Sequence, residues 1–124
     1  MPPSSRRRPE QVAELIRQVI AEALVKDVRD PRLHLVTVTR VEVSPDLSFA
    51  RVYALAHGED QTRAEALEGL QSAAGFFRSR VAKALSARIT PELRFELDKG
   101  AEHASRIDQI LADLKREGTE GASS

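Results

Sequence analysis

The stretch from Leu70 to Pro91 constrains the fold most, because it combines a helical pattern, an internal glycine and concentrated positive charge. Its apolar residues recur at helical spacing, which predicts one face on a core and one face in solvent. These residues are Phe77, Val81, Ala84, Leu85 and Ile89. The same stretch carries basic residues with no acid among them, although the whole chain sums to zero: Arg78, Arg80, Lys83 and Arg88. The chain therefore gathers positive charge on one predicted helix.

Gly75 interrupts this pattern just before the basic residues. A glycine inside a helix costs about 1 kcal/mol relative to alanine, so the run Ala73-Ala74-Gly75 predicts either a close-packing point or a kink between two helical segments. At a kink, the second segment presents free backbone N–H groups and the positive end of its dipole, which suit a phosphate. The alternative, in which the glycine only allows tight packing and the basic residues form an ordinary solvated face, stays open from this segment alone.

The part of the chain before this stretch predicts a helix and a hairpin. Apolar residues recur every three or four positions from Val12 to Leu24, which indicates an amphipathic helix, and Pro31 ends the pattern. Two runs rich in β-branched and aromatic residues, Leu35 to Val43 and Phe49 to Ala56, predict antiparallel strands joined by turn residues. The alternation of the first run slips near Thr39–Arg40, which predicts a bulge.

A helix, a strand and a last helix are predicted for the remainder. The acidic residues from Glu59 favour a helix start, because they complement the positive end of the dipole, and this helix runs into the predicted kink. Leu93 to Asp98 alternates without a slip and predicts a strand with one buried face. Lys99-Gly100 is a predicted break, and Ala104 to Leu114 has the spacing of a helix that ends near Gly118.

The predicted order is helix, strand, strand, kinked helix pair, strand, helix. Three strands in one layer and the helices in the other make a two-layer α+β domain, in which the helix pair crosses over to the third strand. This order matches a KH domain of type II, a nucleic-acid-binding fold, although the GxxG loop of that fold is missing. We expect a flexible basic tail at residues 1–7, a KH-like RNA-binding domain at 8–115 and a disordered tail at 116–124.

Composition excludes several classes of function. The chain has no cysteine, which excludes disulfides, thiolate metal sites and cysteine nucleophiles. One Tyr, four Phe and no Trp leave little material for a protein that reads bases mainly through aromatic rings. No apolar run reaches membrane length and the amino terminus has no apolar signal segment, so we expect a soluble, cytoplasmic protein.

The sequence shows no pattern of catalytic or cofactor-binding residues. His34, His57 and His103 have neither HExxH spacing nor a partner acid at a metal-ligand interval, so we interpret them as surface or capping residues. The glycines form neither a P-loop nor a GxGxxG turn, and no nucleophile-elbow pattern surrounds a serine. We therefore predict no enzyme activity, no metal and no cofactor.

Five motifs, in order along the chain, are similar to one family. They are Asp30-Pro31-Arg32-Leu33, Val36-Thr37-Val38-Thr39, Val41-Glu42-Val43-Ser44 with Asp46-Leu47, Ala73-x-Gly75-Phe76, and Thr90-Pro91-Glu92-Leu93-Arg94-Phe95. Together they strongly resemble the ribosome-binding factor A family, over about Arg8 to Leu114.

The resemblance implies an assembly factor that binds the immature small (30S) ribosomal subunit, assists maturation of the 5′ end of 16S rRNA and is needed for growth in the cold. The implied partners are that subunit and its rRNA, with room for other assembly factors such as an assembly GTPase, and we expect a monomer. The RNA-facing positions carried over from the family are Ala73 and Gly75 at the kink, then Arg78, Arg80 and Lys83. Basic residues of loops and tails vary in placement and come second: Arg29, Arg32, Arg88, Arg6, Arg7 and Arg8.

Two other classes of function stay open. A protein-interaction module without RNA contact would dock a partner through its apolar faces and its acidic carboxy-terminal helix. A small hydrolase would need a convergent acid, base and nucleophile, of which the sequence shows none. Salt dependence separates RNA binding from apolar docking, because each phosphate contact makes log affinity fall against log salt with a slope of about −0.7 to −0.9.

Overall fold

The order of helices and strands agrees with the sequence prediction in the computed structural model, which describes residues 8–86 and 90–123. The elements are α1 (Pro9–Lys26), the 3₁₀ helix η2 (Pro31–Leu33), β1 (Val36–Val43), β2 (Phe49–Ala56), α2 (Asp60–Ser72), α3 (Ala74–Leu85), β3 (Glu92–Leu97) and α4 (Lys99–Ser123). The α+β class and the KH-like order are thereby confirmed.

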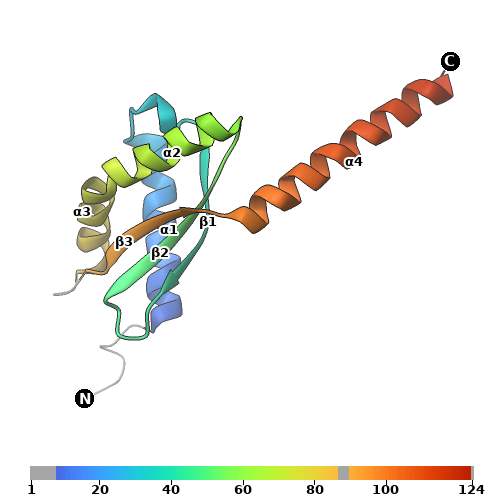
Figure 1. The fold of residues 1–124 in the computed structure, drawn as a ribbon. Helices are drawn as coiled ribbons and strands as arrows, with labels where there is room; N and C mark the ends of the chain where they lie inside the picture. Colours follow the sequence, from blue (N-terminus) through green and yellow to red (C-terminus); the bar gives the residue numbers. More distant parts are fainter. Residues whose placement is uncertain (1–7, 87–89, 124) are drawn as a thin grey trace.

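The three strands form one mixed sheet in the order β1-β2-β3 (Figure 1). β1 and β2 pair antiparallel as the predicted hairpin, whereas β3 pairs parallel with β2. A parallel pair needs a long crossover connection, and α2 with α3 supplies it. The register of the hairpin shifts between Val38 and Arg40, so the predicted bulge is confirmed and Thr39 is the extra residue.

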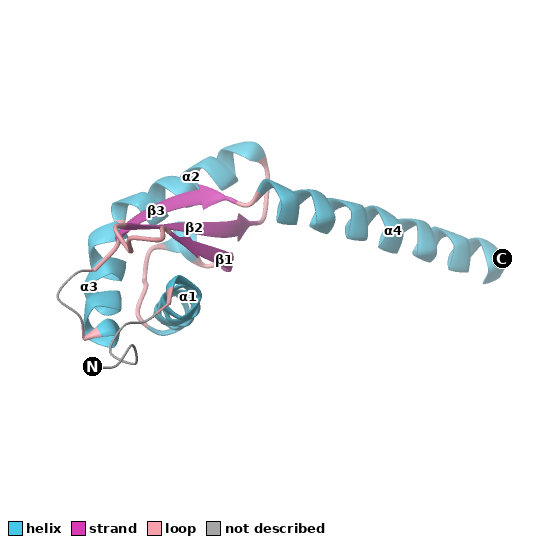
Figure 2. Ribbon diagram, turned by 90° about the horizontal axis from the view of Figure 1, so that it is seen from below, coloured by secondary structure: helices cyan, strands magenta, loops and turns pink. Residues whose placement is uncertain are grey.

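The core lies between one face of the sheet and the helices α1, α2 and α3 (Figure 2). The alternation predicted for β2 and β3 is present, because their core-facing side chains are buried: Ala50, Val52, Ala54, Ala56, Leu93 and Phe95. The ring of Phe95 packs against the ring of Phe77 from α3, with 5.7 Å between centroids. The third strand therefore has the register that its sequence predicts.

The predicted kink is confirmed at Ala73, which separates α2 from α3. Ala73 has φ −90° and ψ 4°, outside the helical range, while its N–H still donates to the carbonyl of Gly69 at 3.0 Å. Gly75 itself is the second residue of α3 and has no positive φ. The chain thus bends at the residue before the helix, and the glycine follows the bend.

The last helix, α4, departs from the prediction in its bounds. It begins at Lys99, where the sequence predicts a break, and it continues past Gly118 to Ser123. The early start has a local cause, because the carboxylate of Asp98 accepts the N–H of Ala101 at 3.0 Å and so caps the helix. The division of the chain at residue 115 stays a prediction, and residues 1–7 lie outside the described residues.

The placement of α4 corrects the expectation that every helix packs on the sheet. Figures 1 and 2 show α4 extending away from the domain. Its apolar side chains are between 42% and 59% exposed: Ile107, Ile110, Leu111 and Leu114. The other helices already cover the inner face of the sheet, and the outer face carries ion pairs such as Arg51 with Glu96 at 2.8 Å. On that outer face, arginines also lie over the two aromatic rings, Arg40 over Tyr53 and Arg94 over Phe49.

Candidate nucleic-acid interface

The helix α3 is fixed to the domain by one face and leaves the other in solvent. Phe77, Val81 and Leu85 recur every four residues and are buried against α1 and the sheet. Arg78, Arg80 and Lys83 are all exposed. The predicted division into an apolar inner face and a polar outer face is therefore confirmed.

The structure separates the basic residues of α3 into two groups. Successive residues of a helix are about 100° apart, so Arg78 and Lys83 lie roughly 140° apart around the axis. Arg78 turns toward the loop before β3, where its Nη2 donates to the carbonyl of Thr90 at 3.1 Å. Arg80 turns toward α1, where its Nη1 lies 3.0 Å from Oδ2 of Asp27. The predicted basic face thus has Arg80 and Lys83 on the side of α1 and Arg78 on the other side.

Lys83 and Arg80 border a hollow of about 340 Å³ between α1 and α3. Its other lining residues are Val19, Glu22, Ala23, Asp27 and Ala84. Arg80 is held there by Asp27 and by the ring of Phe76, whose centroid lies 5.0 Å from the guanidinium carbon. Among the described residues, the side chain of Lys83 makes no ion pair and no hydrogen bond, so its ammonium group is available to an external anion.

The start of α3 exposes backbone. Gly75 is exposed, and a Cβ built on it would meet no atom within 4 Å. The close-packing alternative is therefore wrong for Gly75. The first N–H groups of a helix lack partners in their own helix and lie at the positive end of its dipole. The glycine keeps the space beside these groups open, which suits the approach of a phosphate.

The close packing that the sequence suggests for a glycine occurs instead at Gly69. Gly69 is buried in α2, and a Cβ built there would lie 3.1 Å from Cδ2 of Leu33 and 3.3 Å from Nε of Arg32. Sequence reasoning missed this contact. The available signal was the helical spacing that puts Gly69 on the same side as Ala66 and Leu70, which are buried.

The remaining basic residues are not gathered at α3. The guanidinium of Arg32 is paired with Asp30, with 2.7 Å between Nη2 and Oδ2, and this hydrogen bonding holds the pKa of Asp30 below its usual value. The side chain of Arg32 also lies close to Gly69 of α2. Arg29 is exposed in the loop after α1, and Arg8 directly precedes the first residue of α1. Three further predicted site residues lie outside the described residues: Arg6, Arg7 and Arg88.

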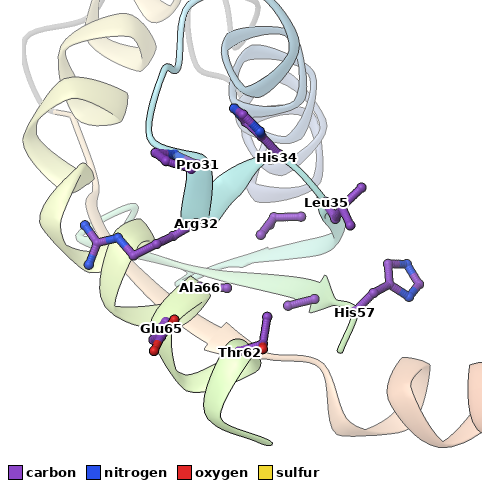
Figure 3. A pocket seen from close by; sticks show the side chains of 10 residues that line it. Pro31, Arg32, His34, Leu35, His57, Thr62, Glu65 and Ala66 are labelled. Carbon is purple, nitrogen blue, oxygen red and sulfur yellow. The ribbon is translucent and has the colours of Figure 1, made fainter. Parts of the chain in front are cut away.

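A larger hollow, of about 430 Å³, lies where β1 begins, β2 ends and α2 starts (Figure 3). Its lining includes His34, His57, Arg32 and Glu65, with Pro31, Leu35, Val36, Ala56 and Ala66 among their apolar neighbours. In Figure 3 the imidazole of His57 points away from Glu65. No group of three or more His, Asp or Glu side chains in the described part of the chain is placed to hold a metal ion. The hollow thus assembles no convergent acid, base and nucleophile.

Solved structures share this fold. The crystal structure of ribosome-binding factor A from Thermus thermophilus has a TM-score of 0.64 and 29% sequence identity, and the match covers 72% of this chain and 93% of that one. A homology model of the Thermus thermophilus factor, fitted into the cryo-EM map of a complex with the 30S subunit, has a TM-score of 0.61 and 28% identity, over 73% of this chain and 96% of that one.

Sequence comparisons agree with the structures. Ribosome-binding factor A of Rhodopirellula baltica is 46% identical over 119 residues, which are 96% of this chain and 86% of the relative. The protein of the same name from Desulforamulus reducens is 43% identical over 107 residues, 86% of this chain and 89% of the relative. The family model of ribosome-binding factor A matches residues 8–111. Because the match spans the sheet, the kink and α3, the chain belongs to the ribosome-binding factor A family.

Proposed function

We propose that this chain binds the immature small ribosomal subunit and assists maturation of the 5′ end of 16S rRNA, as an assembly factor needed for growth in the cold. The observation that carries the proposal is the fit of a homology model of the Thermus thermophilus factor, which has the same fold, into the cryo-EM map of a complex with the 30S subunit. The open backbone at Gly75 and the unpaired ammonium of Lys83 add a surface suited to phosphate. Members of this family are binding factors, not enzymes.

Some of the proposed RNA-contacting groups already have a partner within the protein, and others do not. The backbone at Ala73 and Gly75 and the side chains of Lys83 and Arg29 can meet RNA without breaking an interaction between described residues. Three arginines already have a partner and offer RNA only their remaining N–H groups: Arg78 donates to Thr90, Arg80 pairs with Asp27 and Arg32 pairs with Asp30. Arg88 and the run from Arg6 to Arg8 complete the proposed set.

The same proposal places the chain in the cytoplasm, where it acts as a monomer together with other assembly factors such as an assembly GTPase. Within the described residues, no helix has both the length and the apolar character needed to cross a membrane.

A charge-reversal pair tests the proposed interface. Lys83→Glu places a carboxylate where the proposal has a phosphate, so we expect affinity for purified small subunits to fall roughly 10-fold or more at low salt. Lys99→Glu makes the same charge change at the exposed start of α4, away from α3, and should bind as the wild type does. Both variants are measured by co-sedimentation with small subunits, large subunits and whole ribosomes. Equal binding of the two variants would remove α3 from the interface.

The exposed stripe of α4 favours a second candidate, a protein-interaction module that docks through apolar side chains. Affinity for small subunits measured between low and physiological salt distinguishes the two. RNA contact predicts a slope of about −0.7 to −0.9 per phosphate, whereas apolar docking predicts almost no change. A salt-independent affinity would replace the RNA-contact proposal by docking on a protein.

A further inference from the structure

Phe76 is a large apolar side chain on the outer side of α3. It is 37% exposed, whereas the next residue, Phe77, is fully buried. The two rings meet at a steep angle, with 5.6 Å between centroids and 63° between planes. Such an edge contact uses at most one face of the Phe76 ring. The guanidinium of Arg80 also lies over this ring, so the part of Phe76 that stays exposed is what another flat group can reach.

The surroundings of the ring are positive on one side. The guanidinium carbon of Arg80, one turn further along α3, lies 5.0 Å from the centroid of Phe76. Asp27, which follows α1 directly, keeps Arg80 in this position through an ion pair of 3.0 Å. Lys83 continues the same strip of the helix, about 10 Å along the axis from Phe76. The strip therefore presents a ring, a held guanidinium and an unpaired ammonium in a row.

The ring of Phe76 has only small residues beside it toward the amino-terminal end of α3. The residues one turn before Phe76 are small, namely Ser72 and Ala73, so neither has a side chain large enough to cover the ring. Gly75 precedes the ring directly, and a Cβ there would meet nothing within 4 Å. A flat group can thus reach the ring beside the open backbone at the start of α3.

We infer that Phe76 is a base-stacking residue, which takes the base of an unpaired rRNA nucleotide on its ring while the backbone phosphates of that strand lie toward Lys83. Aromatic faces bind bases of any identity, and neighbouring cations track the backbone of single-stranded RNA. The charges of the strip and the open backbone favour RNA over an apolar protein surface. The inference rests on the proposed function and adds the class of ligand, a single strand with accessible bases.

The test distinguishes stacking on the aromatic ring of Phe76 from a general apolar contact. Phe76→Leu keeps an apolar side chain, and Phe76→Tyr keeps an aromatic ring. Each protein is titrated with a short, labelled single-stranded RNA and with an abasic strand of the same length, after its folded fraction has been measured by thermal unfolding. We expect the wild type and Phe76→Tyr to bind the base-bearing strand roughly 10-fold more tightly than the abasic one, whereas Phe76→Leu binds the two strands alike.

Lys83→Gln is the matched control, because it removes a phosphate contact and leaves the ring. It should weaken binding of both strands, reduce the salt slope by about 0.7 and retain the preference for bases. If the wild type binds neither RNA nor small subunits, the proposed function itself fails. If the wild type binds RNA but shows no base preference, or if Phe76→Leu keeps that preference, only the stacking inference is overturned. Loss of small-subunit binding by Phe76→Leu with unchanged RNA binding would assign the ring to a ribosomal protein and also overturn it.

Discussion

Gly75 and Gly69 lie in adjacent helices but in opposite surroundings. Gly75→Ala adds a methyl group in open space, so we expect the free energy of unfolding to rise by up to about 1 kcal/mol through helix propensity. Affinity for small subunits should fall, because the methyl group lies where the proposed RNA contact needs the backbone. Chemical denaturation and co-sedimentation of the same protein measure both effects. A loss of stability with normal affinity per folded molecule would contradict this account of Gly75.

Gly69→Ala is the matched comparison. Its methyl group would lie 3.1 Å from the buried Cδ2 of Leu33, and crowding of this kind costs about 1–3 kcal/mol. Because the gain in helix propensity offsets only part of this cost, we expect a net loss of roughly 1 kcal/mol. Binding should change only as far as the folded fraction changes. We thus expect the free energy of unfolding to rise for Gly75→Ala and to fall for Gly69→Ala.

Phe95 joins β3 to α3 in the centre of the core. It is 6% exposed and packs on Phe77, so Phe95→Ala leaves a cavity that should cost about 3–5 kcal/mol, a large part of the stability of a domain of this size. Glu96→Ala changes the next residue, which faces outward and pairs with Arg51, and should cost less than about 1 kcal/mol. Urea unfolding compares the two. Similar losses would show that the core does not depend on this ring.

At the level of elements, one carboxylate links the bulge of β1 to the start of α4. The extra residue of the bulge, Thr39, donates its hydroxyl to Oδ2 of Asp98 at 2.6 Å, while Oδ1 accepts the N–H of Ala101. The Thr39 hydrogen bond, then that from Ala101, lowers the pKa of Asp98 against the opposing effect of burial. Arg40 adds a cation, with its Nε 3.5 Å from the carboxylate. The bulge therefore positions the hydroxyl group that anchors α4.

This link predicts a pH dependence. The pKa of Asp98 is lower in the folded protein than the value of about 3.9 in an unfolded chain, so its contribution is complete above that value and is lost as pH falls through the folded pKa. Asp98→Ala should reduce the free energy of unfolding by about 1–2 kcal/mol at neutral pH, by loss of the helix cap. The deficit should shrink below roughly pH 4.

Urea unfolding at neutral pH and in acid measures this deficit. Asp108→Ala is the control, because it removes an equal charge from an exposed position of the same helix. It should have little effect at either pH. A deficit for Asp98→Ala that is equal at both pH values would show that the ionised carboxylate is not what anchors the helix.

At the level of the whole molecule, the core and the projecting part of α4 are separate. The core extends from Val12 to Phe95, and the ion pair of Arg63 with Glu102, at 3.6 Å, holds the first turns of α4. A chain that ends at Arg106 keeps this pair and removes the exposed stripe, so its melting temperature should stay within about 2 °C of the wild type. Calorimetry of the two proteins measures this. A fall of more than about 5 °C would mean that the stripe packs on the domain in solution.

The sequence by itself determined the features that depend on neighbouring residues. The bounds of Phe49–Ala56, the slip at Thr39, the kink before Gly75 and the inner face of α3 were all predictable, because side-chain periodicity and helix-breaking residues act over a few positions. The concentration of positive charge in α3 is likewise a property of its sequence. A resemblance in five motifs was enough to indicate the family.

The tertiary structure decided which distant groups meet. It pairs Arg80 with Asp27, turns Arg78 toward Thr90 and places Gly69 against η2, none of which follows from the pattern of one helix. It also leaves the apolar stripe of α4 exposed, although this stripe is spaced like that of a packed helix. Periodicity specifies which side of an element is apolar. Which surface covers that side, and which charge comes within reach of a cation, depends on how elements far apart in the chain dock.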